Sequence, residues 1–352
     1  MTTPMRRCFA ACLAVCGCLL LAALASGQQA PGYHLLHKVS LPAAPGGGEY
    51  FDYLYFDPGS RRLFVSQGTA FHVLDGDSLK ILGTVTGLKR DHGVAVVPAL
   101  NRGFISDGDA AEVAVFDLKT FQITRRIPTA KDSDGILYDP VSKRVFCFEG
   151  DPNSVSIIDP ASEKVLKTLP LGGSPEQAVA DGKGMIYDNL ADKGEVVAIN
   201  AATMRVVSRW PVAPAGEPTA MAMDRAHRRL FIAGRKPASM IVMNADTGKL
   251  VGPAYPIGAR VDSCTFDAGT ALAACSTGDG TIHILHEDSP NRFHIVQTVK
   301  TEAGAKTMTF DPETHRLFVD TADFATPAAT AAQPHPRAAA KPGTLHVLVY
   351  GR

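Results

Sequence analysis

The stretch FDPETHRLFVD (Phe310–Asp320) decides the fold, because a near copy, FDPGSRRLFVS (Phe56–Ser66), stands near the other end of the chain. Both stretches have the pattern of a strand, a tight turn and a second strand. Related hairpins lie between them. The residues that end the first strand are Asp57, Val97, Asp139, Asp181, Asp224, Asp267 and Asp311, at successive spacings of 40, 42, 42, 43, 43 and 44 residues. A period this regular indicates a repeat architecture.

Each hairpin is followed by a second one. Its first strand is rich in β-branched and other apolar residues and usually ends in Asp or Asn, as in FHVLD, VAVFD, VSIID, VVAIN and MIVMN. A polar turn and a further alternating strand come next. Each unit of about 42 residues therefore contains four antiparallel strands, which is the size of a β-propeller blade.

The two ends of the chain predict how the ring closes. The last unit stops after its third strand, LHVLVYGR, whereas an unpaired strand, YHLLHKVSL (Tyr33–Leu41), precedes the first unit. If that strand completes the last blade, seven whole blades form and the ring closes, which removes exposed sheet edges. We predict an all-β fold: one seven-bladed propeller over residues 26–352. The Ala- and Pro-rich segment 322–343 interrupts the last blade and is predicted to be a mobile surface loop.

The first 25 residues predict export. Arg6 and Arg7 precede an apolar run, and Ala23-Leu24-Ala25 fits the cleavage rule of a signal peptide. We expect a mature chain that starts near Ser26 and is periplasmic or secreted. No later stretch is long and apolar enough to span a membrane. With 35 basic and 35 acidic residues, the chain lacks the basic excess of nucleic-acid or membrane-surface binders, and we expect a monomer.

Three cysteines remain after the predicted signal peptide: Cys147, Cys264 and Cys275. Cys264 and Cys275 fall on paired strands of one blade and can form a disulfide if they are directly opposite. We expect two buried free thiols instead, because Cys147 occupies the repeat position of Cys275 and has no partner. No CxxC or CxxCH motif indicates a zinc ribbon or a c-type haem.

The sequence resembles the YVTN/YncE-like family of exported seven-bladed propellers over essentially all of the mature chain. The resemblance is carried by DHGVAVVPALNRGFISDG (residues 91–108), DGILYDPVSKRVF (residues 134–146) and GGSPEQAVADGKGMIYDNLADKGEVVAIN (residues 172–200). It implies the fold and export. It implies no catalytic residues, because the family has no agreed catalytic motif, and this chain writes LFVS, VFCF and LFVD instead of the YVTN tetrapeptide.

Most acids and histidines have structural explanations. Asp57, Asp139 and Asp311 start the hairpin turns, and an Asp or Asn recurs at the end of the third strands, where it accepts backbone N–H groups. His72, His283 and His346 share one third-strand position in neighbouring blades. Blades are too far apart for three equivalent side chains to meet at one ion, so we expect these histidines to be sheet-face residues.

One register stands out. The residues five positions before the seven strand ends are all polar: Asp52, His92, Asp134, Glu176, Thr219, Asp262 and Lys306. Since the first strand of a propeller blade is innermost, these residues should circle one mouth of the channel. They are either the solvent-exposed first residues of their strands, without a further role, or a ring that binds a cationic or polyhydroxyl ligand or a divalent ion. With His92 neutral, their formal charges are four negative and one positive.

No GxSxG, HExxH or Walker A motif is present. We therefore expect a module that binds a protein partner or a small ligand at its loop face, without a catalytic residue and without a cofactor, although a divalent cation stays open. The alternative is a metal-assisted, lactonase-like hydrolase that uses the ring, with His92 as the base. A redox function fits less well, because the haem motif is missing.

Overall fold

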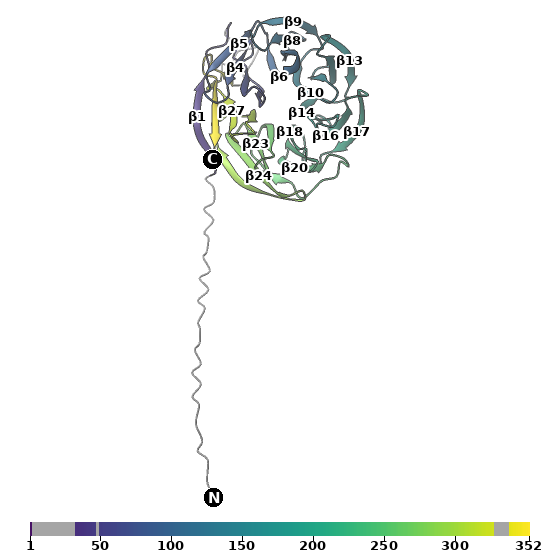
Figure 1. Ribbon diagram of the computed structural model, residues 1–352, viewed down its shortest axis with the longest axis vertical. Helices are drawn as coiled ribbons and strands as arrows, with labels where there is room; N and C mark the ends of the chain where they lie inside the picture. The colour runs from purple at the N-terminus through teal and green to yellow at the C-terminus, as the bar shows by residue number, and fades with distance from the viewer. Residues whose placement is uncertain (2–31, 47–48, 327–337) are drawn as a thin grey trace. The chain divides into compact units, whose positions relative to one another are not determined.

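The structure, a computed structural model, describes Met1 and residues 32–46, 49–326 and 338–352. The unit Gly32–Arg352 consists of seven four-stranded antiparallel sheets arranged around a central channel (Figure 1). The innermost strands β2, β6, β10, β14, β18, β22 and β26 contact one another in this order, and β26 contacts β2, so the ring is closed. The predicted seven-bladed β-propeller is confirmed. The predicted signal peptide, residues 1–25, lies outside the described residues apart from Met1.

In each of the first six blades, the strands follow one another along the chain from the innermost outward. The first three contain β2 (Leu54–Asp57), β3 (Arg62–Ser66), β4 (Ala70–Asp75) and β5 (Ile81–Thr86); β6 (Asp91–Val97), β7 (Arg102–Asp107), β8 (Glu112–Asp117) and β9 (Ile123–Pro128); and β10 (Ser133–Asp139), β11 (Arg144–Glu149), β12 (Ser154–Asp159) and β13 (Lys164–Pro170). A 3-10 turn, η1 (Pro98–Leu100), joins β6 to β7.

The next three contain β14 (Pro175–Ala180), β15 (Met185–Leu190), β16 (Glu195–Asn200) and β17 (Arg205–Pro211); β18 (Pro218–Asp224), β19 (Arg229–Arg235), β20 (Ala238–Asn244) and β21 (Tyr255–Pro256); and β22 (Val261–Asp267), β23 (Leu272–Thr277), β24 (Thr281–Ser289) and β25 (Arg292–Lys300). The seventh contains β26 (Met308–Phe310), β27 (Leu317–Thr321), β30 (His346–Gly351) and β1 (His34–Ser40).

The seventh blade is built from both ends of the unit Gly32–Arg352. Its sheet has the order β1-β30-β27-β26, so the N-terminal strand is its outermost member. The pairing is antiparallel, from His34 opposite Gly351 to Ser40 opposite His346, with one irregularity between Leu35 and His37. The predicted closure by the segment Tyr33–Leu41 is therefore confirmed.

The hydrophobic core lies between the blades. The described residues form seven apolar clusters, one at each interface between neighbouring blades. Between the seventh and first blades, for example, Phe56 and Phe318 stack with their ring centroids 5.6 Å apart. These residues belong to the two hairpins with the most similar sequences. A first-strand residue of one blade thus packs on a second-strand residue of its neighbour.

The turn aspartates behave as predicted and also do more. Asp139 accepts the backbone N–H of Ser142 at 2.9 Å, and Asp311 accepts that of Glu313 at the same distance. Asp311 additionally pairs with Arg61 of the first blade at 2.7 Å. Equivalent pairs between neighbouring blades join Arg228 to Asp181 at 2.7 Å and His315 to Asp267 at 2.8 Å. One turn residue therefore fixes its own hairpin and links it to the next blade.

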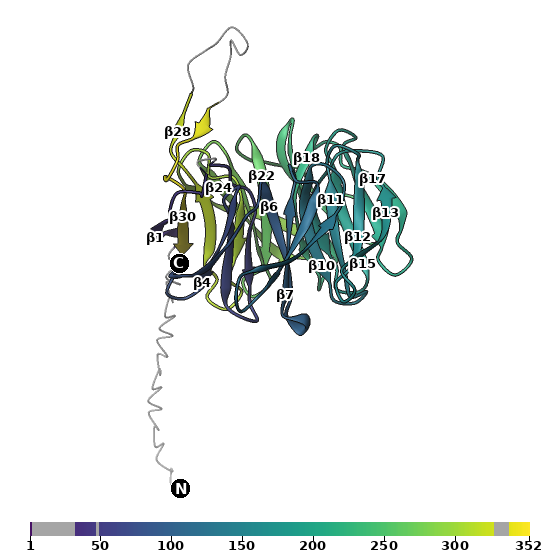
Figure 2. The ribbon, with the colours of Figure 1, turned by 90° about the horizontal axis from the view of Figure 1, so that it is seen from above.

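An insertion separates β27 from β30. Its described parts form a short antiparallel pair, β28 (Phe324–Ala325) with β29 (Ala339–Ala340), which projects beyond the blades in Figure 2. Residues 327–337, the middle of the predicted mobile loop, lie outside the described residues. Because second strands end, and third strands begin, at the end of the channel where first strands start, β28 and β29 stand on that face. In the described part of the chain, no helix is long and apolar enough to cross a membrane.

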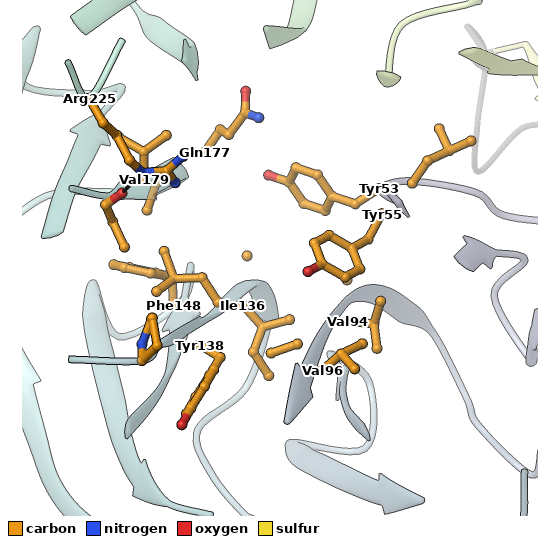
Figure 3. A pocket seen from close by; sticks show the side chains of 18 residues that line it. Tyr53, Tyr55, Val94, Val96, Ile136, Tyr138, Phe148, Gln177, Val179 and Arg225 are labelled. Carbon is orange, nitrogen blue, oxygen red and sulfur yellow. Dashed lines mark hydrogen bonds between the residues drawn. The ribbon is translucent and has the colours of Figure 1, made fainter. Parts of the chain in front are cut away.

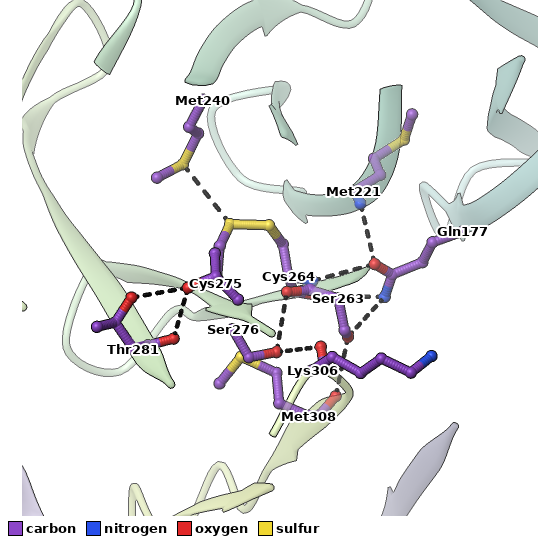
Figure 4. The surroundings of a disulfide bond; sticks show 11 residues. Gln177, Met221, Met240, Ser263, Cys264, Cys275, Ser276, Thr281, Lys306 and Met308 are labelled. Carbon is purple, nitrogen blue, oxygen red and sulfur yellow. Dashed lines mark hydrogen bonds between the residues drawn. A yellow bond between two sulfur atoms is a disulfide. The ribbon is translucent and has the colours of Figure 1, made fainter. Parts of the chain in front are cut away.

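The expectation of free thiols at Cys264 and Cys275 is wrong, since the two residues form a disulfide (Figure 4). They are directly opposite one another in the β22–β23 pair, and their Cα atoms are 4.1 Å apart. Cys147 is buried and free, because the residue opposite it is Ile136. The analogy between Cys147 and Cys275 failed because the facing strand, and not the shared repeat position, decides whether a bond forms.

Candidate functional site

The structure places the seven polar residues of the predicted register at one end of the channel, where the first strands begin. His92, Asp134, Glu176, Thr219 and Asp262 lie in the first halves of β6, β10, β14, β18 and β22, whereas Asp52 and Lys306 precede β2 and β26. Each is buried or half-buried. Neighbouring members of the register therefore come close enough to interact, and most of them do.

His92 is the centre of the first group of contacts. Its Nδ1 atom lies 2.8 Å from Asp52 Oδ2 and 3.1 Å from Asp134 Oδ1. The Tyr50 hydroxyl donates to Asp52 Oδ2 at 2.9 Å and lies 3.2 Å from His92 Nδ1. The Arg90 guanidinium covers the Tyr50 ring at 4.6 Å from its centroid. Three consecutive blades thus contribute charged side chains to one contact.

Lys306 continues the contacts in the other direction around the mouth. Its Nζ atom bonds to Asp262 and lies 3.8 Å from Asp52 Oδ1. Arg235 also bonds to Asp262, and its Nε donates to the Val261 carbonyl at 3.0 Å. Acidic and basic groups therefore alternate along one connected series, which we call the mouth network: Asp134, His92, Asp52, Lys306, Asp262 and Arg235.

The charges in the mouth network compensate one another. Burial alone would lower the pKa of His92, but its hydrogen bonds to Asp134 and Asp52, together with their charges, raise that pKa to about 10. Burial acts to raise the pKa of Asp52, yet Lys306 and His92 outweigh it and hold that pKa at about 2. His92 is consequently a cation at neutral pH. With His92 charged, the predicted register holds two cations, His92 and Lys306, against its four acidic residues, so a smaller negative excess remains there. Arg235 supplies the third cation against the three acids of the mouth network.

Glu176 and Thr219 stand apart from the network. Burial, together with the nearby charges of Asp134 and Asp262, raises the pKa of Glu176 to about 8, so this carboxyl is largely protonated at neutral pH. Thr219 is buried, and its hydroxyl donates to the Glu217 carbonyl at 3.1 Å. Glu176 therefore offers a neutral carboxyl at the mouth, whereas Thr219 is engaged in the local backbone.

Below this level, two side chains separate the mouth from the rest of the channel. The Gln177 amide oxygen accepts the backbone N–H groups of Met221 and Cys264 at 3.0 and 3.1 Å, and its nitrogen donates to the Cys264 carbonyl at 3.2 Å (Figure 4). One side chain of β14 thereby bonds to β18 and β22. Tyr53 comes from the opposite side; its ring occupies space beside Gly93, where a Cβ atom would lie 3.5 Å from the ring.

The histidines His72, His283 and His346, which share one third-strand position, do not meet at one site; each contacts a different group. His72 contacts Gln67 Oε1 at 2.6 Å, His283 accepts from the Gly258 N–H at 2.7 Å, and His346 contacts Glu302 Oε2 at 2.9 Å. Among the described residues, the His and carboxylate groups close enough to share an ion include Asp52, His92 and Asp134, whose ligand atoms lie within 4.8 Å of one another.

Several contributors to the mouth were not predicted from the sequence. Tyr50, Arg90 and Gln177 fall outside the register that repeats in every blade, so the repeat gives no signal for them. By contrast, the sequence does predict that Arg235, near the loop after a second strand, faces the side of the register; only its pairing with Asp262 depends on the arrangement of two adjacent blades. The repeat predicts which backbone positions face the channel, but the partners of a long side chain depend on its neighbours in space.

The fold and this site define the class: a seven-bladed β-propeller with a network of compensating charges at one channel mouth. No protein-family model and no curated protein matches the sequence. Among solved structures, the chain is similar to Kuenenia stuttgartiensis hydrazine synthase, with a TM-score of 0.66 and 13% identity over 84% of this chain and 96% of that chain. At this identity the similarity concerns the fold alone.

Proposed function

We propose that this protein is an exported propeller of the YVTN/YncE-like type that binds a small polyhydroxyl ligand at the mouth network. The observation that carries the proposal is the alternation of donors and acceptors from Asp134 through His92 and Asp52 to Lys306. A hydroxyl group can donate to a carboxylate and accept from an ammonium group at the same time. Because the charges compensate, a ligand without net charge fits this surface better than a simple cation.

Thermal-shift measurements on the purified mature protein test this proposal with three classes of probe: sugars and polyols, amines, and divalent ions. A ligand that binds the folded state raises the melting temperature, by an amount equivalent to about 2.7 kcal/mol at one hundred times its Kd. We expect a polyol to give the largest shift. The double variant Asp134→Asn with Asp262→Asn should lose most of that shift relative to its own ligand-free melting temperature.

The matched control is Asp151→Asn, which removes a carboxylate from an exposed loop of the same face and should leave the shift unchanged. No response to any probe, or an equal response of the double variant, would place ligand binding elsewhere on the molecule.

The alternative, a metal-assisted hydrolase, has one observation in its favour. Asp52, His92 and Asp134 present their ligand atoms within 4.8 Å of one another, as a divalent ion requires. Metal analysis of the purified protein and assays with simple lactones decide between the two functions. A stoichiometric ion together with lactone turnover that Asp134→Asn abolishes would support hydrolysis and contradict a pure binding function.

Export is part of the same proposal. The disulfide between Cys264 and Cys275 is typical of proteins in an oxidising compartment, which agrees with the predicted signal peptide. We expect intact-mass analysis of the protein from its native cell to show a chain that starts near Ser26 and lacks the two hydrogens lost in one disulfide. An intact Met1 on a fully reduced cytosolic chain would contradict export.

A further inference from the structure

A cavity occupies the channel on the side of Tyr53 and Gln177 away from the mouth network. Its volume is about 420 Å³, and its lining contains Tyr53 and Gln177 but none of the seven register residues of the mouth. The first four blades form its walls, and the apolar side chains labelled in Figure 3 are Val94, Val96, Ile136, Phe148 and Val179. This volume lies within the range of small-molecule sites, which are mostly apolar with a few polar groups. We call it the axial cavity.

The polar groups of the axial cavity gather near the turns that end the first strands. Arg225, in the turn after β18, lies at the edge of the cavity in Figure 3, and its Nε donates to the Ala180 carbonyl at 2.9 Å. Within the described residues, its other guanidinium N–H groups and the hydroxyls of Tyr55 and Tyr138 have no hydrogen-bond partner. One anchored cation and two phenol groups are therefore available to a ligand.

The neighbouring acids do not neutralise Arg225. Asp224 precedes it in the chain, but its carboxylate accepts the backbone N–H groups of Ala226 and His227 at 2.9 and 3.2 Å and contacts His227 Nδ1 at 2.7 Å. Asp57, beyond Tyr55, is likewise bonded to Ser60 at 2.6 Å through the serine hydroxyl. Both acids are buried in their turns. The axial cavity thus combines an apolar interior with an exposed positive charge at its rim.

We propose that the axial cavity is a second binding site, separate from the mouth network, for a small apolar molecule that carries one carboxylate. The apolar part of the ligand fills the space between Val94, Ile136 and Val179, and its burial there removes apolar surface from water. The carboxylate accepts two hydrogen bonds from Arg225, since a guanidinium matches the geometry of a carboxylate. Tyr55, which lines the cavity from the first blade, presents a further hydroxyl donor to the same space.

Calorimetric titration with 3-phenylpropionate and its uncharged amide tests this proposal. The two probes share an apolar part and differ in the charge that Arg225 would recognise. We expect the acid to bind at least tenfold more tightly than the amide. In the variant Arg225→Gln, a change at an exposed side chain, the affinity for the acid should fall to that for the amide. The control Arg292→Gln removes an exposed arginine on the outermost strand of the sixth blade and should change neither affinity.

A third variant tests the apolar wall. Val179→Phe places a larger side chain in the axial cavity and should lower the affinities for the acid and the amide alike. Circular dichroism and the melting temperature show whether this variant folds. The proposal is overturned if neither probe binds the wild-type protein, if the acid and the amide bind equally, or if Arg225→Gln binds the acid as well as the wild type does.

Discussion

Deleting the segment Tyr33–Leu41 is expected to abolish the soluble monomer or to lower its melting temperature by roughly 10 °C or more. The deletion removes β1 (His34–Ser40), so the backbone groups of β30 that pair with this strand lose their hydrogen-bond partners. It also removes Tyr33 and Leu41, which are 5% and 4% exposed and belong to two different inter-blade clusters. Burial of such a side chain contributes about 1.5–3 kcal/mol, and an open sheet edge invites aggregation.

The comparison should be made with Leu35→Ser, because Leu35 lies in the same strand but its side chain is 48% exposed. This variant keeps every backbone pair of β1 and should melt within a few degrees of the wild type. Size-exclusion chromatography and thermal unfolding of both proteins give the answer. If the deletion variant is monomeric and melts like the wild type, β1 is not needed to close the ring.

The variant Glu176→Gln is expected to be more stable than the wild type in alkaline solution and nearly equal to it in acid. The pKa of Glu176 is raised by burial to about 8 in the folded protein, against an ordinary value near 4.5 in the unfolded chain. The favourable contribution of its protonated form is complete below the unfolded pKa and is lost as the pH rises through the folded pKa. A glutamine cannot ionise, so the variant avoids this loss.

The free energy of unfolding of both proteins, measured by urea titration at pH 5 and pH 8.5, should show this divergence. Each unit of pKa difference corresponds to about 1.36 kcal/mol, so we expect the variant to gain on the order of 3 kcal/mol at pH 8.5 and under about 1 kcal/mol at pH 5. Glu313→Gln, at a side chain that is 74% exposed, should show no such trend. Parallel pH profiles of wild type and Glu176→Gln would mean that Glu176 is solvated and ordinary.

His92 acts over a different pH range. Its pKa of about 10 in the folded protein exceeds the ordinary value of 6.5, so its ion pairs stabilise the fold fully below pH 6.5 and are lost as the pH rises through 10. Wild-type stability should therefore decline on the alkaline side from both groups, and the difference between Glu176→Gln and wild type isolates one of them.

The repeat period explains why the fold was predictable. Each unit carries its own turn residues, strand pattern and strand end. A unit with a weak pattern can therefore be assigned from the other six. The residues facing the channel, such as His92 and Asp262, followed from the same register. The protonation of His92 did not, because it depends on Asp52 and Asp134 in the two adjacent blades. The disulfide was missed for a similar reason: the sequence does not show that Cys264 is directly opposite Cys275.

The axial cavity had no signal in the sequence. Its floor is formed by Tyr53 and Gln177, two residues at one repeat position where the other five blades carry the smaller residues Gly93, Gly135, Ala220, Ser263 and Thr307. Small residues at that position leave the room that two large side chains from other blades then occupy. A repeat pattern reports what the blades share, whereas a cavity on the axis arises from how they differ.

The placement of β1 also sets the order in which the molecule can be completed. A ribosome or a translocation pore delivers β1 before any other strand of the ring, yet its partner β30 is the last strand to emerge. Six blades can assemble one after another from neighbouring segments during delivery, but the seventh must wait for the final residues. Until then the earliest strand stays without its partner, and joining the two ends of so long a segment is expected to be the slow step of folding.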